Sequence, residues 1–222
     1  MTVSDADGSG AARIAQSFYI RGSSRAFKFV VPDVSGDDGA DLLLDGEIRD
    51  HVHTDGPRPL NKTGTGTLRL GASNKRTPAL YKDADNITQF GNPESWTGKF
   101  TVSEGVLLCG VDEALDGMAG IVLAGGKLDV AGTKTDTGTL TVSQNGEIAL
   151  GDGGEISFAD SSKIAWTSGK ALSITGAGRI RFGNSSSALT AVQLSAIKMN
   201  GKTVRISSTG YLKTNGLFIC IQ

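Results

Sequence analysis

The residues best suited to metal chemistry are the two histidines of the chain, His51 and His53, which lie two positions apart. Asp55 continues the same spacing, so in an extended strand the three side chains share one face. Imidazole and carboxylate together form a ligand set that transition metals accept. A solvated loop that leads into Gly56-Pro57 accounts for the same residues more simply, and we therefore predict no metal site.

Acid–base chemistry would need carboxylates and basic side chains that are brought together from different parts of the chain. Polysaccharide lyases and hydrolases with a β-helix fold gather such groups from adjacent coils. The candidates here are spread over the second half of the chain: Asp152, Asp160, Lys163, Arg179 and Arg181. A nucleophilic triad is not indicated, because no Gly-x-Ser-x-Gly motif occurs. Charges on solvated outer faces explain the same residues, so the sequence predicts no catalytic residue.

Several short segments begin like cofactor-binding or calcium-binding loops without completing the motif. Gly64-Thr65-Gly66 and Gly176-Ala177-Gly178 lack the rest of a phosphate-binding loop and lead into strand-like runs. Residues 5–10 open like a calcium loop, but Gln16 stands where the bidentate glutamate is needed. We interpret the glycine pairs as turns and predict no cofactor.

Aromatic side chains and cysteines complete the set of candidates. An exposed group of Tyr81, Phe90, Trp96 and Trp166 would suit sugar stacking, but the simpler prediction is packing, with Trp166 in the core at the end of a strand. The two cysteines, Cys109 and Cys220, each lie in an apolar run and are interpreted as buried thiols, with a disulfide left open.

Composition and charge narrow the class of protein. The chain has 222 residues, 31 of them glycine, and 38% are hydrophobic, which suits short strands and tight turns better than a helical bundle. The formal net charge is −1 with both signs interspersed, so no nucleic-acid partner is expected. No apolar run approaches the roughly 18 residues that span a bilayer, so no membrane insertion is expected. The first residues lack the features of a signal peptide, which leaves an intracellular protein or an export signal already removed.

Short runs with alternating polarity recur at similar intervals between Leu60 and Phe182. In one such run Leu128 and Val130 share a face while Lys127 and Asp129 share the other, which indicates a strand with one buried side. The uniform run length favours an all-β fold, a right-handed parallel β-helix or β-solenoid with capping segments, over the alternative of a β-sandwich.

The organisation predicted along the chain has three parts. Residues 1–59 form N-terminal strands, either a cap or the first coils. Residues 60–186 form the solenoid repeats, including a strand at Lys163-Ile164-Ala165-Trp166 and an excursion over residues 75–95. Residues 187–222 form a C-terminal cap of strands and one short helix over residues 189–197, which Ser187 or Thr190 begins as N-cap.

Two stretches resemble the autotransporter-associated β-strand repeat family. The first is Leu60-Asn61-Lys62-Thr63-Gly64-Thr65-Gly66-Thr67-Leu68-Arg69-Leu70-Gly71, and the second runs from Trp96-Thr97-Gly98 to Gly105-Val106-Leu107-Leu108. Trp96 stands in place of the usual tyrosine and Phe100 in place of a small polar residue. The segment from 189 to 212 also resembles the one that closes many such exported passengers. The resemblance spans about residues 40 to 215 and implies a parallel β-helix that is exported.

On these grounds we expect a non-enzymatic structural or adhesive passenger segment, secreted or displayed on a bacterial surface. Its expected partners are copies of itself, in a homo-oligomer or fibre, or host and surface glycans. The alternative is a carbohydrate-active β-helix enzyme. Chain-to-chain pairing is predicted through the apolar tail formed by Leu217, Phe218, Ile219, Cys220 and Ile221.

Overall fold

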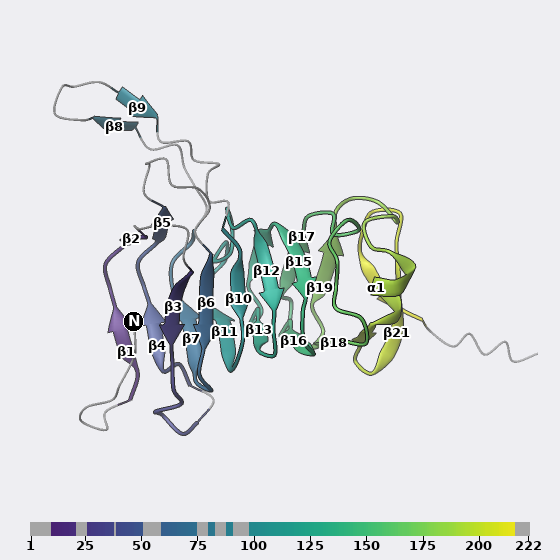
Figure 1. Cartoon of the computed structure of the whole chain (residues 1–222), viewed down its shortest axis with the longest axis horizontal. Coiled ribbons are helices and arrows are strands. Elements are labelled where there is room, and N and C mark those ends of the chain that lie inside the picture. The colour runs from purple at the N-terminus through teal and green to yellow at the C-terminus, as the bar shows by residue number, and fades with distance from the viewer. Residues whose placement is uncertain are drawn as a thin grey trace, which may run out of the picture.

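A computed structural model describes residues 10–20, 26–37, 39–50, 59–74, 80–82, 88–90 and 98–215 of the chain. Within these ranges the protein is built almost entirely of short strands, with one short helix. The strands stack side by side along one axis, with the first strands at one end of the molecule and the helix at the other (Figure 1).

Three sheets form the faces of the stack. The first face consists of β3 (Phe27–Val30), β6 (Leu60–Thr63), β10 (Phe100–Val102), β12 (Gly120–Leu123) and β15 (Thr139–Val142). The second face consists of β1 (Ala12–Ile14), β4 (Leu42–Leu44), β7 (Thr67–Leu70), β11 (Val106–Cys109), β13 (Lys127–Asp129), β16 (Gly146–Ala149), β18 (Leu172–Thr175) and β20 (Ile197–Met199). The third face consists of β14 (Lys134–Thr137), β17 (Glu155–Phe158) and β19 (Arg179–Phe182).

The chain visits these faces in a repeating order, so each coil stacks its strands on those of the preceding coil. Leu107 of β11 is level with Leu128 of β13, which in turn is level with Ile148 of β16. All pairings within the three faces are parallel up to β20. This arrangement is the predicted parallel β-solenoid, and the sandwich alternative is excluded.

The core consists of inward-facing columns that run along the stack. On the second face Leu68, Leu107, Leu128, Ile148 and Ile174 occupy successive levels of one column, and each side chain is fully buried. Burial of one such side chain contributes about 1.5–3 kcal/mol relative to leaving it exposed. On the third face the rings of Phe158 and Phe182 stack with centroids 5.1 Å apart. The alternation in the sequence therefore identifies the buried side correctly at these levels of the second face.

Three strands before residue 60, β1, β3 and β4, belong to the same sheets as strands after it. β3 pairs with β6 and β4 pairs with β7, so the sheets cross the boundary predicted between residues 59 and 60. β2 (Phe18–Ile20) and β5 (Ile48–Asp50) pair in parallel and follow second-face strands in the chain order. The N-terminal part thus forms the first coils.

The predicted excursion, residues 75–95, is described only in part. Its described portion is an antiparallel hairpin of β8 (Leu80–Lys82) and β9 (Thr88–Phe90), which Figure 1 shows beyond the stack. Asn74, the residue before the excursion, bridges two coils. Its Oδ1 accepts a hydrogen bond from the Ile48 amide at 2.9 Å, and its Nδ2 donates to the Ala114 carbonyl at 2.6 Å. One side chain therefore replaces a strand where the regular hydrogen bonding is interrupted.

The strand predicted over residues 163–166 is wrong. This segment is a turn-rich loop, and no first-face strand follows β15 in the described part of the chain. The indole Nε1 of Trp166 donates to the Leu140 carbonyl at 3.0 Å, and the Thr167 amide donates to the Val142 carbonyl at 2.9 Å. The loop thereby covers the edge of β15 without forming a strand of its own.

The C-terminal end is closed by a helix and a hairpin. The helix α1 (Ala191–Ser195) is shorter than predicted because Ile197 already belongs to β20. Thr190 is its N-cap, as one of the two predicted alternatives, in a reciprocal capping box with Gln193. β21 (Lys202–Ile206) and β22 (Leu212–Thr214) then continue the second face in antiparallel pairings. An antiparallel bridge between Arg181 and Tyr211 joins this hairpin to the third face.

Candidate functional site

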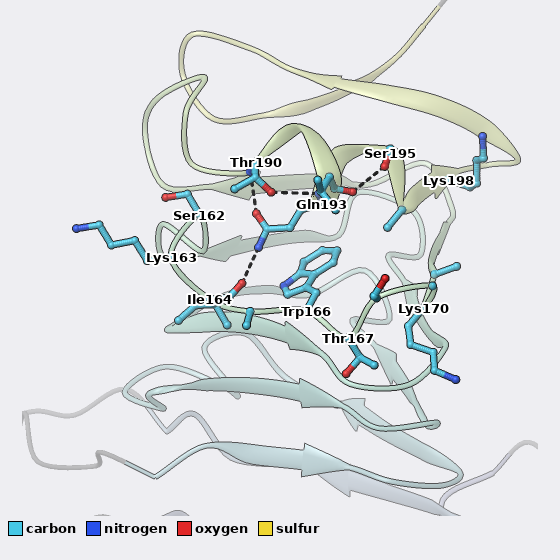
Figure 2. A pocket seen from close by; sticks show the side chains of 16 residues that line it. Ser162, Lys163, Ile164, Trp166, Thr167, Lys170, Thr190, Gln193, Ser195 and Lys198 are labelled. Atoms are coloured by element: carbon cyan, nitrogen blue, oxygen red, sulfur yellow. Dashed lines mark hydrogen bonds between the residues drawn. The ribbon is translucent and has the colours of Figure 1, made fainter.

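A hollow lies where the first face lacks a strand. It has a volume of about 570 Å³ and is bounded by residues 162–171 on one side and by α1 and its flanks on the other. We call it the terminal groove. Figure 2 shows the side chains that line it, with Trp166 near the centre. The groove exists because the coil after β15 reaches the second face through a loop and leaves the place of a strand unfilled.

Trp166 is the residue around which the groove is organised. Its side chain is partly buried, and its N–H is committed to the Leu140 carbonyl. The hydrogen bond fixes the position of the indole, while part of the ring remains open to the groove (Figure 2). The core packing predicted for Trp166 is thus only partly correct, because the residue also forms the floor of a surface hollow.

Gln193 connects the two walls of the groove. Its side chain is 4% exposed, and its Nε2 donates to the carbonyls of Ser161 and Ile164, at 2.9 Å each. Its Oε1 accepts a hydrogen bond from the Thr190 amide at 2.7 Å. The partners of its side chain are all backbone groups, so Gln193 holds α1 against the loop.

The lining of the groove is polar and basic with one apolar projection. Lys163, Lys170 and Lys198 line it together with several serine and threonine hydroxyls, and no aspartate or glutamate does. Val192 is 77% exposed, and among the residues whose side-chain burial is described it is the one large hydrophobic residue that is exposed. Such a lining suits binding. It offers no carboxylate for acid–base chemistry.

A second, shallower hollow on the third face brings some of the predicted catalytic candidates together. Asp160 and Arg181 line it with Asp136 and Ser157, and its volume is about 420 Å³. Hydrogen bonds from the hydroxyl and the amide of Ser162 hold the pKa of the Asp160 carboxyl below its ordinary value. Asp160 is therefore charged at neutral pH and is poorly suited to act as a general acid.

The other candidates do not join this hollow. Asp152 is exposed and lines neither hollow, and Lys163 belongs to the terminal groove. Arg179 lies with its guanidinium carbon 4.2 Å from the ring centroid of Tyr211, whose hydroxyl donates to Glu155 at 2.8 Å. This group fastens the C-terminal hairpin to the third face, so Arg179 has a structural role.

Sequence reasoning missed a buried lysine. Lys62 of β6 is fully buried and is level with the inward-facing Phe29 and Val102. Its Nζ donates to the carbonyls of Gly64 and Glu104, the latter at 3.0 Å. Burial lowers its pKa to about 8 from the ordinary 10.5, against the opposing charges of Asp41 and Glu104. The signal was present in the sequence, because Lys62 has the same parity as the inward-facing Leu60.

Asp41 organises the same corner between the first and second faces. It is 1% exposed, and its carboxylate accepts hydrogen bonds from the amides of Val34 at 2.7 Å, Ser35 at 2.9 Å and Thr67 at 2.7 Å. Burial raises the pKa of this carboxyl, but the three backbone donors outweigh it and hold the pKa below the ordinary value. We call Lys62, Asp41 and Glu104 the buried polar corner.

The remaining candidates divide by whether the structure describes them. Cys109 is a free, fully buried thiol, and burial followed by the charge of Asp129 raises its pKa. The histidines and Asp55, residues 5–9, Trp96 and the apolar tail with Cys220 lie outside the described residues, as do the side chains of Tyr81 and Phe90. The described part of the chain contains no cluster of three or more potential metal ligands. In the same ranges no helix is long and apolar enough to cross a membrane.

Comparisons with protein-family models, curated proteins and solved structures give no match to this chain. The resemblance to the autotransporter-associated repeats therefore stays a prediction from the quoted residues.

Proposed function

We propose that this chain is a non-enzymatic structural or adhesive passenger segment, secreted or displayed on a bacterial surface. The observation that carries the proposal is one continuous solenoid whose C-terminal end is closed by a dedicated cap. The strand edges there are covered by the loop of Trp166, by the β21–β22 hairpin and by the Arg181–Tyr211 bridge. A stack of this kind is a rigid rod with a defined tip, which suits presentation of a surface at a distance.

Assembly with copies of the chain belongs to the same proposal. β1 and β3 are the outermost described strands of their sheets, and an outermost strand is where another chain adds by main-chain hydrogen bonding. The tail of residues 217–221 is the second candidate for such pairing. Self-association through either end would convert the rod into a dimer or a fibre.

Electron micrographs of the purified chain, together with light scattering, test the proposal. We expect rods of uniform length, as monomers or in ordered assemblies. Deletion of residues 217–221 should leave the circular dichroism spectrum unchanged and reduce the assembled fraction. An unchanged oligomer size would remove the tail from the proposal, and irregular compact particles would contradict the rod.

A carbohydrate-active enzyme is the second candidate, and one observation favours it. The third-face hollow places carboxylates and a basic side chain, Asp136, Asp160 and Arg181, around one depression. Acidic and neutral polysaccharides incubated with the chain would be assayed for reducing ends and for unsaturated products. We expect no turnover. Turnover that Asp160→Asn and Arg181→Gln abolish, and the exposed Asp152→Asn does not, would establish the enzyme and overturn the proposal.

A further inference from the structure

The terminal groove has the size and the composition of a ligand site. Its volume of about 570 Å³ lies within the range of about 300–1,000 Å³ that is typical of small-molecule pockets. Trp166 supplies an aromatic surface that is fixed by a hydrogen bond, and Val192 supplies the exposed apolar side chain. Exposed apolar groups beside convergent polar groups are the usual mark of a binding surface.

The occupant is not an added β-strand. A strand would extend the first face by hydrogen bonding to the outward carbonyls of β15. Those of Leu140 and Val142 already accept bonds from the Trp166 indole and the Thr167 amide, and the Leu140 amide donates to Ser161 Oγ at 3.0 Å. Recognition in the groove must therefore come from side chains, which excludes the edge-pairing mode expected of the tail or of a second copy.

The charge of the lining selects for anions. Three lysines line the groove without any carboxylate, although the whole chain carries a net charge of −1. The charge of Lys163 acts on the Asp160 carboxyl, but Asp160 faces the third-face hollow and does not line the groove. Lys170 and Lys198 lie on the opposite side of Trp166 from Lys163, and the three side chains extend outward at the rim of the groove (Figure 2).

We infer that the terminal groove binds an acidic oligosaccharide, a short chain of uronate or sulfated sugars. The apolar face of a sugar ring stacks on Trp166, its hydroxyls meet Thr167, Ser168 and their neighbours, and its anionic groups pair with the lysines at the rim. This inference rests on the proposed function, because it names the glycan class that an adhesive rod would hold at its capped tip. It requires no bond to be made or broken.

Titration calorimetry on the full chain tests the inference with four probes: a trimer of galacturonic acid, a heparin-derived tetrasaccharide, maltotriose and a trimer of N-acetylglucosamine. We expect one or both acidic probes to bind and the neutral probes to bind at least tenfold more weakly. Affinity should fall as salt is raised from low to physiological ionic strength. Absence of binding by both acidic probes, or equal affinity for the neutral ones, would overturn the inference.

Matched variants locate the site. The triple substitution Lys163→Gln, Lys170→Gln and Lys198→Gln should weaken binding about tenfold or more, because three charges at the rim are lost together. The control removes the same number of positive charges outside the groove, by Lys→Gln at the exposed Lys134, Lys202 and Lys213. It should alter affinity by less than about twofold. Equal losses in both triples would show non-specific attraction and would contradict a site in the groove.

Val192→Asp gives an independent test, because the side chain is 77% exposed and the change should leave thermal unfolding almost unaltered. It places a carboxylate beside the ligand, and we expect at least a tenfold loss of affinity for the acidic probes. Unchanged affinity would contradict the inference. If no saccharide binds while the rods stay intact, this inference fails and the proposed function stands. If the chain cleaves a polysaccharide, the proposed function fails and the binding result remains valid.

Discussion

The buried polar corner and the capped edge of β15 both use side chains to hydrogen-bond backbone groups, but the corner is enclosed in the solenoid and the edge borders an open groove. At the corner, Lys62 and Asp41 lie inside the stack and satisfy backbone groups of three successive coils. At the edge, Trp166 satisfies the Leu140 carbonyl from a loop that borders an open groove. In the first region water cannot replace a lost side chain, whereas in the second it can. We therefore expect the loss of a buried polar side chain to cost most stability where coils continue on both sides.

The largest effect is expected from Asp41→Ala. The change leaves three backbone amides without their acceptor and removes a charge beside the buried Lys62. We expect a loss of about 3–5 kcal/mol in the free energy of unfolding, measured by urea denaturation. The control Asp152→Ala, at an exposed carboxylate, should change it by less than about 0.5 kcal/mol. A loss below about 1 kcal/mol for Asp41→Ala would show that water reaches the corner.

The second effect is a pH dependence that comes from Lys62. Its pKa is about 8 in the folded protein and 10.5 as the ordinary value. Between these values the unfolded chain binds a proton that the folded chain does not, so stability rises with pH. The penalty for burying the charged amine is present in full below about pH 8 and disappears as pH passes 10.5.

The matched variant for this prediction is Lys62→Met, which keeps a side chain of similar length but has no titrating amine. Unfolding free energies of both proteins would be measured by urea denaturation at several pH values between 7.5 and 10.5. The stability of the natural chain relative to the variant should rise by up to about 3 kcal/mol over this range. Ionisation of the Cys109 thiol on unfolding lowers stability as pH rises, because burial raises its pKa in the folded protein. This effect is the same in both proteins and cancels in the difference. A constant difference would mean that the amine is not desolvated.

The smallest effect is expected from Trp166→Phe, which removes the indole N–H and keeps an aromatic ring. The Leu140 carbonyl loses its donor, but the adjacent groove admits water to replace it. We expect a loss of about 1 kcal/mol in the free energy of unfolding by urea denaturation. A loss as large as that from Asp41→Ala would place Trp166 in a dry interior and would remove the distinction between the two regions.

The fold class could be predicted from the sequence because side chains alternate between the two faces of a strand and short strands recur along the chain. The buried side of such a run, as in Leu128 and Val130, could be assigned from alternation alone. The same rule failed at Ile164 and Trp166, whose spacing fits a strand. The partner that decides their conformation is Leu140, which is 26 residues earlier in the chain. Alternation within a run contains no information about a contact at that distance.

The candidate site was harder to predict than the fold, for a related reason. The sequence singled out Trp166 as an aromatic residue and Lys163 as a basic one, but nothing in their spacing relates them to Lys198 or Val192. From the sequence, Asp160 and Arg181 were candidates that could meet only through the alignment of strands in adjacent coils. That alignment brings them together, in a hollow on the third face, while Arg179 is engaged by Tyr211.

Local alternation and turn residues act over a few positions, so the amino-acid sequence specifies a ladder of short, one-sided strands joined by glycine-rich turns. Only the tertiary structure decided which levels of the ladder line up, where Lys62 is enclosed, and which coil omits its first-face strand to leave the terminal groove. Those features depend on the stacking of residues about 20 or more positions apart, as Leu107 and Leu128 illustrate. Such stacking is fixed by the packing of whole coils, and the composition of any one run does not specify it.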